Sequence, residues 1–164
     1  MDDYDANNNS QFMFKPADSV STLLYAGPAW DYDTSFGAYS SKNKRASINP
    51  SLFWVNRDND AGWYHALYSH EEFREAVCRV WKERFKPAMD ILNGKAVDET
   101  GTLLSIDEYA AMVSASGKMD YIRWPDLKKF TAAAGAAGDY PGNVKRLKNF
   151  ASKRAAWLDK QWGR

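Results

Sequence analysis

The spacing of apolar residues changes at Trp63, and this change constrains the fold more than any other feature of the sequence. Before Trp63, apolar residues stand in short runs that polar and proline-containing stretches separate. After Trp63 they recur at intervals of three and four residues, which is typical of amphipathic helices. The sequence therefore predicts a mainly α-helical protein with a short β-hairpin near its N-terminus.

Two short apolar runs near the start of the chain predict the hairpin. Residues 11–15 carry aromatic side chains at alternating positions, and residues 22–25 supply a second strand. Pro16 and the polar residues after it have the composition of a turn. Gly27-Pro28 should end the second strand, because proline cannot donate a hydrogen bond to the ladder.

Local signals predict where the helices begin and end. Ser69 with Glu72, and Ser105 with Glu108, match the capping box, in which each side chain bonds the other residue's backbone. The helix after Ser105 is expected to end near Gly117. Further helices should open at Pro87, with a stop at Asn93-Gly94, and at Pro141.

Three of these helices carry an apolar stripe that should face a common core. The residues of these stripes are, in chain order, Phe73, Val77, Val80, Trp81 and Phe85; Ile106, Tyr109, Ala110, Met112 and Val113; and Val144, Leu147, Phe150, Ala151, Trp157, Leu158 and Trp162. At 164 residues, the chain is long enough to bury such a core in one domain.

Charge and composition exclude several classes of function. The formal net charge is +1, which argues against global attraction to nucleic acid or to a membrane surface, and no apolar run is long enough to span a bilayer. Residues 141–164 hold seven basic side chains and one acid, which we interpret as a solvated helix face. The sequence contains no Gly-rich phosphate loop and no Ser-His-Asp pattern.

Two acids follow the second strand and are enclosed by aromatic residues. Asp31 and Asp33 alternate with Trp30 and Tyr32 directly after an apolar run. Carboxylates on a short loop are the oxygen ligands that hard divalent cations take, so this loop is a candidate metal site. The alternative is that Asp31 caps a turn and Asp33 faces solvent, since aspartate is a common turn residue.

The order of the acids along the chain adds a second candidate role. Asp5 precedes the predicted hairpin, and Asp31 follows it. Protein kinases place a catalytic-loop aspartate, which accepts the proton of the attacking hydroxyl, before such a hairpin and a metal-binding aspartate directly after it. This order makes phosphoryl transfer one interpretation of the N-terminal acids.

Several stretches resemble one family. Residues 24–33, followed by Phe36-Gly37, resemble the Gly-Pro-x-Trp-Asp-aromatic-Asp signature of the CotH proteins, which are atypical protein kinases. Residues 10–15 are similar to the strand that precedes that signature. Further matches are Trp63-Tyr64 with residues 72–74, and Arg154 with Trp157-Leu158.

The resemblance implies ATP-dependent phosphorylation of serine or threonine in a protein substrate, with Mg2+ or Mn2+ as the metal. Asp31 would bind the metal, Asp33 would support it, and Asp5 would be the catalytic acid, although Asp3 stands where the family pattern has asparagine. Family members first associated with bacterial spore coats, and relatives on bacterial and fungal surfaces, suggest a spore-coat or cell-surface location.

The resemblance also implies an incomplete kinase. We expect one domain over residues 1–164, divided into an acidic loop, hairpin and metal loop (1–36), a polar loop region (37–62) and a helical body (63–164). This would be the C-terminal lobe of an atypical protein-kinase-like fold, with the nucleotide-binding lobe upstream and no activity in the fragment alone. The alternatives are a non-catalytic surface recognition module and, last, a metal-dependent hydrolase.

Overall fold

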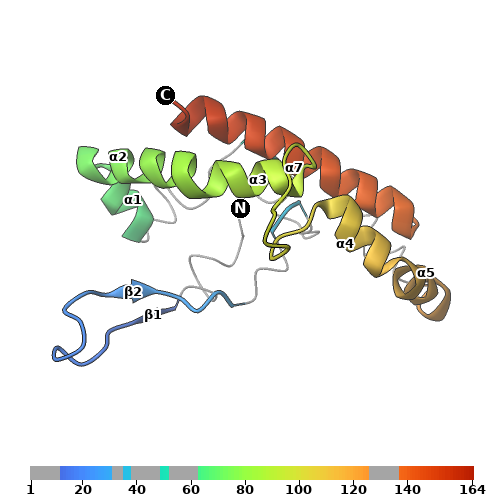
Figure 1. Ribbon diagram of the computed structural model, residues 1–164, viewed down its shortest axis with the longest axis horizontal. Coiled ribbons are helices and arrows are strands. Elements are labelled where there is room, and N and C mark those ends of the chain that lie inside the picture. The colour runs from blue at the N-terminus through green and yellow to red at the C-terminus, as the bar shows by residue number, and fades with distance from the viewer. Residues whose placement is uncertain (1–11, 31–34, 38–48, 52–62, 126–136) are drawn as a thin grey trace.

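The computed structural model describes residues 12–30, 35–37, 49–51, 63–125 and 137–164. Within these ranges the chain is mainly helical, with a short two-stranded antiparallel hairpin near the N-terminus, as the sequence predicts. The hairpin projects away from the long helices, which lie side by side (Figure 1).

The hairpin is shorter than the apolar runs suggest. Strand β1 (Met13–Phe14) pairs with β2 (Tyr25–Ala26), with Met13 opposite Ala26 and Phe14 opposite Tyr25. The rings of Phe14 and Tyr25 stack with their centroids 5.3 Å apart. Such a cross-strand aromatic pair is a main source of stability in a ladder this short.

After the short helix α1, the helices α2, η2 and α3 follow one another and form a nearly continuous rod. Their bounds are α1 (Trp63–Tyr68), α2 (Glu71–Val80), the π-helical turn η2 (Trp81–Phe85) and α3 (Lys86–Leu92). In η2 the Lys86 N–H donates to the Trp81 carbonyl, one residue farther back than in an α-helix. Pro87 follows directly; its ring would clash with the Glu83 carbonyl in regular α geometry, which gives a local reason for the wider turn.

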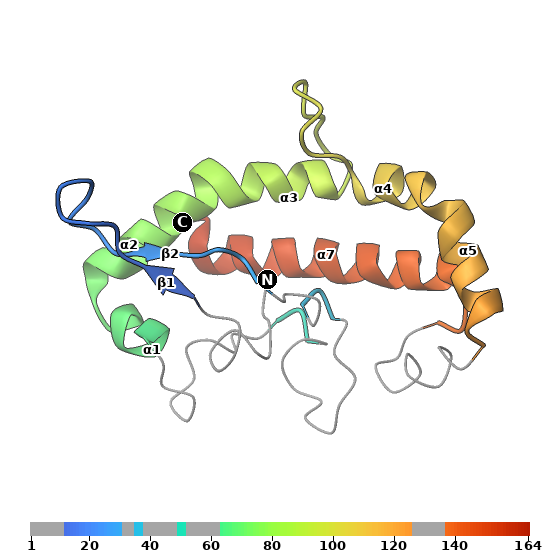
Figure 2. The same ribbon diagram turned by 90° about the horizontal axis from the view of Figure 1, so that it is seen from below.

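The remaining helices turn the chain back along this rod. They are α4 (Ile106–Met112), α5 (Ser114–Arg123) and α7 (Tyr140–Trp162). Helix α5 lies at one end of the layer, and α7 returns antiparallel to α3 (Figure 2). Asp139 caps α7 by accepting a hydrogen bond from the Gly142 N–H at 2.8 Å. None of the helices in the described ranges has the length and apolar character needed to span a bilayer.

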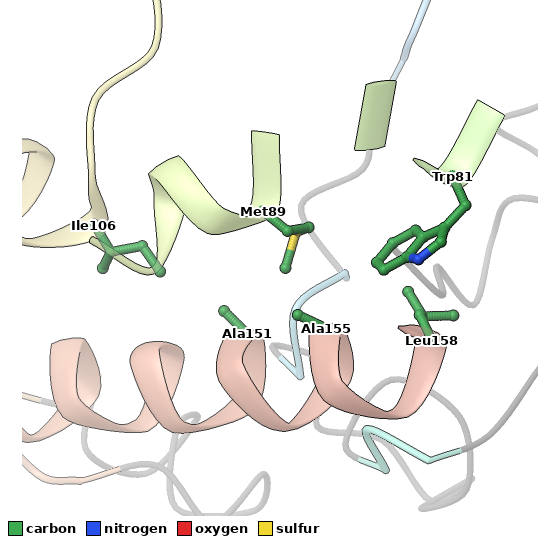
Figure 3. Packing of buried hydrophobic residues seen from close by; sticks show 6 residues of the cluster. All are labelled: Trp81, Met89, Ile106, Ala151, Ala155 and Leu158. Atoms are coloured by element: carbon green, nitrogen blue, oxygen red, sulfur yellow. The ribbon is translucent and has the colours of Figure 1, made fainter. Parts of the chain in front are cut away.

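The core lies between η2, α3 and α4 on one side and α7 on the other. Trp81, Met89 and Ile106 face the opposite helix, α7 (Figure 3). The residues that α7 contributes to the same cluster are Ala151, Ala155 and Leu158. Because two of these side chains are alanines, large side chains from the rod can fill the space between closely packed helices. The predicted apolar stripe of α7 is therefore confirmed.

One predicted capping box forms and the other does not. At α4, the Ser105 hydroxyl accepts from the Glu108 N–H, and the Glu108 carboxylate accepts from the Ser105 N–H. At α2, the N-cap residue is His70, and no side chain caps the helix. The prediction at Ser69 was wrong because its hydroxyl instead donates to the Ala66 carbonyl at 2.7 Å and closes α1.

Two expectations about the helical stripes also differ from the structure. Gly117 does not end a helix: α4 ends at Met112, and Gly117 lies inside α5. Five residues expected to face the core are exposed: Val80 at 41%, Phe85 at 57%, Tyr109 at 42%, Met112 at 73% and Val113 at 52%. Periodicity identifies an apolar face, but it does not reveal that α7 covers only one side of that face.

Candidate functional site

The predicted site residues Asp5, Asp31 and Asp33 lie outside the described residues, but the structure describes the chain on both sides of the acid pair. Trp30 precedes Asp31 at the end of the hairpin. Ser35, two residues after Asp33, begins a short turn that contacts the helical body. The site can therefore be built from its two flanks.

On the upstream flank, the hairpin brings Phe12 and Trp30 together. The Gly27 N–H donates to the Phe12 carbonyl at 2.8 Å, which extends the ladder beyond β1 and β2. The rings of Phe12 and Trp30 then meet edge to face, with centroids 6.3 Å apart. Because the strands are antiparallel, the chain enters and leaves the hairpin at the same end. Phe12 and Trp30, the described residues next in sequence to the stretches that carry Asp5 and Asp31, therefore lie at the same end of the hairpin.

On the downstream flank, the residues after the acid pair are fixed to the helical body. Ser35 is only 6% exposed and Gly37 is buried. Between them, the Phe36 side chain packs against the core and lines an apolar groove of about 410 Å3 together with Ile106 and Leu147. Phe36 has φ = 55°, a left-handed conformation that costs energy for a residue other than glycine.

Arg146 of α7 forms a hydrogen bond with this turn. Its guanidinium donates a hydrogen bond from Nη1 to the Gly37 carbonyl, across 109 residues of sequence. Burial lowers the pKa of the Arg146 guanidinium below its ordinary value, and Tyr121 opposes this shift. The sequence prediction of a solvated basic face missed this role, since nothing in the local pattern distinguishes Arg146 from its basic neighbours.

Arg154, two turns farther along α7, is also buried. It is 3% exposed, and its Nη1 donates to the Pro50 carbonyl at 3.1 Å. Its guanidinium carbon lies 5.0 Å from the centroid of the Trp157 ring, within cation–π range. Arg146 and Arg154 therefore bind carbonyls in the two described ranges 35–37 and 49–51.

Within the described residues, Lys15 contacts the loop that joins the two strands of the hairpin. Its ammonium pairs with Asp18, and it also donates to the carbonyls of Pro16 and Ser21 at 3.2 and 3.3 Å. These contacts close the loop between the two strands. Lys15 therefore has a structural explanation that does not involve the candidate metal loop.

The described ranges contain no group of three or more His, Cys, Asp or Glu side chains that could hold a metal ion. Asp31 and Asp33 lie outside these ranges and stay predicted ligands. Their chemistry fits a hard divalent cation, which prefers carboxylate oxygens to nitrogen or sulfur.

Comparison with known protein families identifies one that covers most of the chain. The family model described as CotH kinase protein matches residues 1–158. The chain therefore belongs to the CotH kinase family, as the sequence motifs indicated. No curated protein and no solved structure matches it.

Proposed function

We propose that this chain is the C-terminal lobe of a metal- and ATP-dependent protein kinase that phosphorylates serine or threonine in a protein substrate. The observation that supports the proposal is a hairpin that lies between Asp5 and Asp31 in sequence and brings Phe12 and Trp30 together at its open end, in a member of the CotH kinase family. Protein kinases use the same order of catalytic acid, hairpin and metal-binding acid.

In this proposal the acids have separate tasks. Asp31 holds Mg2+ or Mn2+, and Asp33 supports it as a second carboxylate. The bound metal neutralises the charge on the nucleotide phosphates. Asp5 accepts the proton of the attacking hydroxyl, which makes the hydroxyl oxygen a better nucleophile. The helical body supplies the fixed platform against which the protein substrate is placed.

Phosphate transfer also needs a segment that covers the nucleotide, and the 164 residues contain no Gly-rich phosphate loop. We therefore propose that a nucleotide-binding lobe encoded upstream completes the active site. The family's association with spore coats and cell surfaces makes a coat or surface protein the proposed type of substrate.

The test compares two proteins: these 164 residues alone, and the same residues with the sequence encoded upstream. Each is incubated with γ-labelled ATP and Mn2+, with and without EDTA, and phosphoserine and phosphothreonine are identified by mass spectrometry. We expect metal-dependent labelling by the longer protein only. Labelling by neither protein, with autophosphorylation and general substrates both tested, contradicts the kinase proposal; autophosphorylation by the 164 residues alone contradicts the need for an upstream lobe.

A further inference from the structure

We propose that the outer face of α5 binds a helix of a partner protein, one in which acidic residues flank an apolar row. Helix α5 lies at the end of the helical layer, and no other described helix lies beyond it (Figure 2). The proposal does not rest on the kinase function, because it uses no residue of the candidate metal loop. All of the residues that carry it are described by the structure.

The inner side of α5 already has a partner in α7. Gly117 lies against the ring of Tyr140, and the Tyr121 hydroxyl accepts a hydrogen bond from the Asn143 amide. Ser114, Gly117 and Tyr121 are all half-buried. Because residues three and four apart lie on the same side of a helix, these positions define the face that α5 turns toward α7.

The opposite side of α5 is also apolar, but it is exposed. Met119 and Ile122 are 58% and 71% exposed, and with the exposed Ala115 they stand at intervals of four and three residues. This is the spacing of the a and d positions along which two helices pack. Met112 and Trp124, just before and just after the helix, are 73% and 57% exposed. A continuous exposed apolar surface of this kind is typical of an interaction site.

Basic side chains border this apolar row on both sides. Lys118 directly precedes Met119 and Arg123 directly follows Ile122, so they occupy the g and e positions that flank the row. Both side chains are exposed, and the guanidinium carbon of Arg123 lies 5.2 Å from the ring centroid of Trp124. The one acid of α5, Asp120, lies farther round the helix.

These charges select the type of partner. In a parallel pair of two identical α5 helices, Lys118 of one copy would face Arg123 of the other; in an antiparallel pair, each would face its own counterpart. Like charges at these positions oppose pairing, so a second copy of the chain is a poor occupant. A helix with glutamate or aspartate beside its own apolar row would place opposite charges at both positions, which favours association and sets the register.

The test measures the binding of three fluorescein-labelled synthetic peptides to the 164-residue chain by fluorescence anisotropy. The first has leucine at the a and d positions and glutamate at e and g, the second has lysine in place of glutamate, and the third contains the residues of the first in an order without helical spacing. We expect the glutamate peptide to bind, the lysine peptide to bind at least about tenfold more weakly, and the reordered peptide not to bind. Added salt should weaken binding of the glutamate peptide.

Variants of the chain then locate the binding surface. Ile122→Glu should weaken binding of the glutamate peptide at least about tenfold, and replacing both Lys118 and Arg123 with glutamate should reverse the preference in favour of the lysine peptide. Val97→Glu is the matched control and should have no effect, because Val97 is 86% exposed but lies in the loop between α3 and α4. Circular dichroism checks folding, and Met119→Glu provides the same comparison should Ile122→Glu not fold.

Other occupants of this face give different results. Self-association of the chain that Ile122→Glu abolishes, measured by analytical ultracentrifugation, would assign the face to a second copy. Binding to vesicles of equal parts phosphatidylcholine and phosphatidylserine that depends on Ile122, without binding of the glutamate peptide, would assign it to a membrane surface. Either result overturns the proposal, and so does a glutamate peptide that does not bind, that binds no better than the lysine peptide, or that binds Ile122→Glu as tightly as wild type.

Discussion

Glu108 makes a contribution to stability that depends on pH. Its carboxylate accepts hydrogen bonds from the Ser105 hydroxyl and N–H at 2.7 and 2.8 Å, and these bonds lower the pKa of Glu108 below its ordinary value of 4.5. Folding therefore favours the charged form. The resulting stability is present above the ordinary pKa and is lost as pH falls through the lowered one.

We therefore expect Glu108→Gln to lower the thermal unfolding temperature at pH 7, and the difference from wild type to shrink as the pH falls below the ordinary carboxyl pKa. Circular dichroism at 222 nm across a pH series measures both. Glu99→Gln, in an exposed loop outside the capping box, is the control and should not reproduce this pH dependence. A difference for Glu108→Gln that stays constant with pH would contradict this explanation.

Individual side chains also show what the sequence could and could not reveal. The capping box at Ser105 was predicted correctly because its partners are three residues apart. The roles of Arg146 and Arg154 were not foreseeable, since their carbonyl partners are 109 and 104 residues away. A basic residue bonded to a distant carbonyl looks the same in sequence as one in solvent.

Helix α5 approaches α7 closely at Gly117, where the absence of a side chain leaves room for Tyr140. A Cβ at Gly117 would overlap the ring of Tyr140, whose hydroxyl donates to the Ala110 carbonyl at 2.6 Å. Gly117 was predicted to end a helix, but the structure assigns it to a helix–helix contact. The sequence signal for a helix stop and for a close approach is the same glycine.

Gly117→Ala tests this contact. Alanine favours helix formation by about 1 kcal/mol over glycine, but the clash with Tyr140 should cost about 2–3 kcal/mol, so we expect a net loss of about 1–2 kcal/mol. Chemical denaturation measures the free energy of unfolding. Ser116→Ala, at the exposed neighbouring position, should change it by no more than about 0.5 kcal/mol. A Gly117→Ala variant more stable than wild type would show that Tyr140 moves aside freely.

At the scale of whole elements, periodicity predicted the helices better than it predicted their partners. The stripe of α7 is buried as expected, with Phe150, Ala151 and Leu158 in the interior. The stripe of α2 and η2 is only partly covered, because α7 contacts η2 and α3 and leaves Val80 and Phe85 exposed. The wider turn of η2, which precedes Pro87, has no simple signal in the apolar pattern.

For the molecule as a whole, the mainly helical fold with an N-terminal hairpin was predicted from sequence, and so was membership of the CotH family. The candidate acids were found by their spacing around the hairpin, a feature local enough to read from one sequence. What the structure adds is the contacts on either side of Asp31 and Asp33: the Trp30 ring meets Phe12 in the hairpin, and Ser35 is buried. Such contacts depend on tertiary structure that no local pattern contains.

The proposed role of Asp31 as the ligand of the catalytic metal is tested by Asp31→Asn in the protein that includes the upstream sequence. Asparagine keeps the shape of the side chain but removes the charge that a hard cation requires. Asp18→Asn is the matched control, because Asp18 is an exposed aspartate that pairs with Lys15. Both variants are compared with wild type by Mn2+-dependent phosphate transfer from labelled ATP, with folding checked by circular dichroism. We expect at least about a hundredfold loss for Asp31→Asn and no loss for Asp18→Asn; wild-type activity in a folded Asp31→Asn protein would show that the metal is held elsewhere.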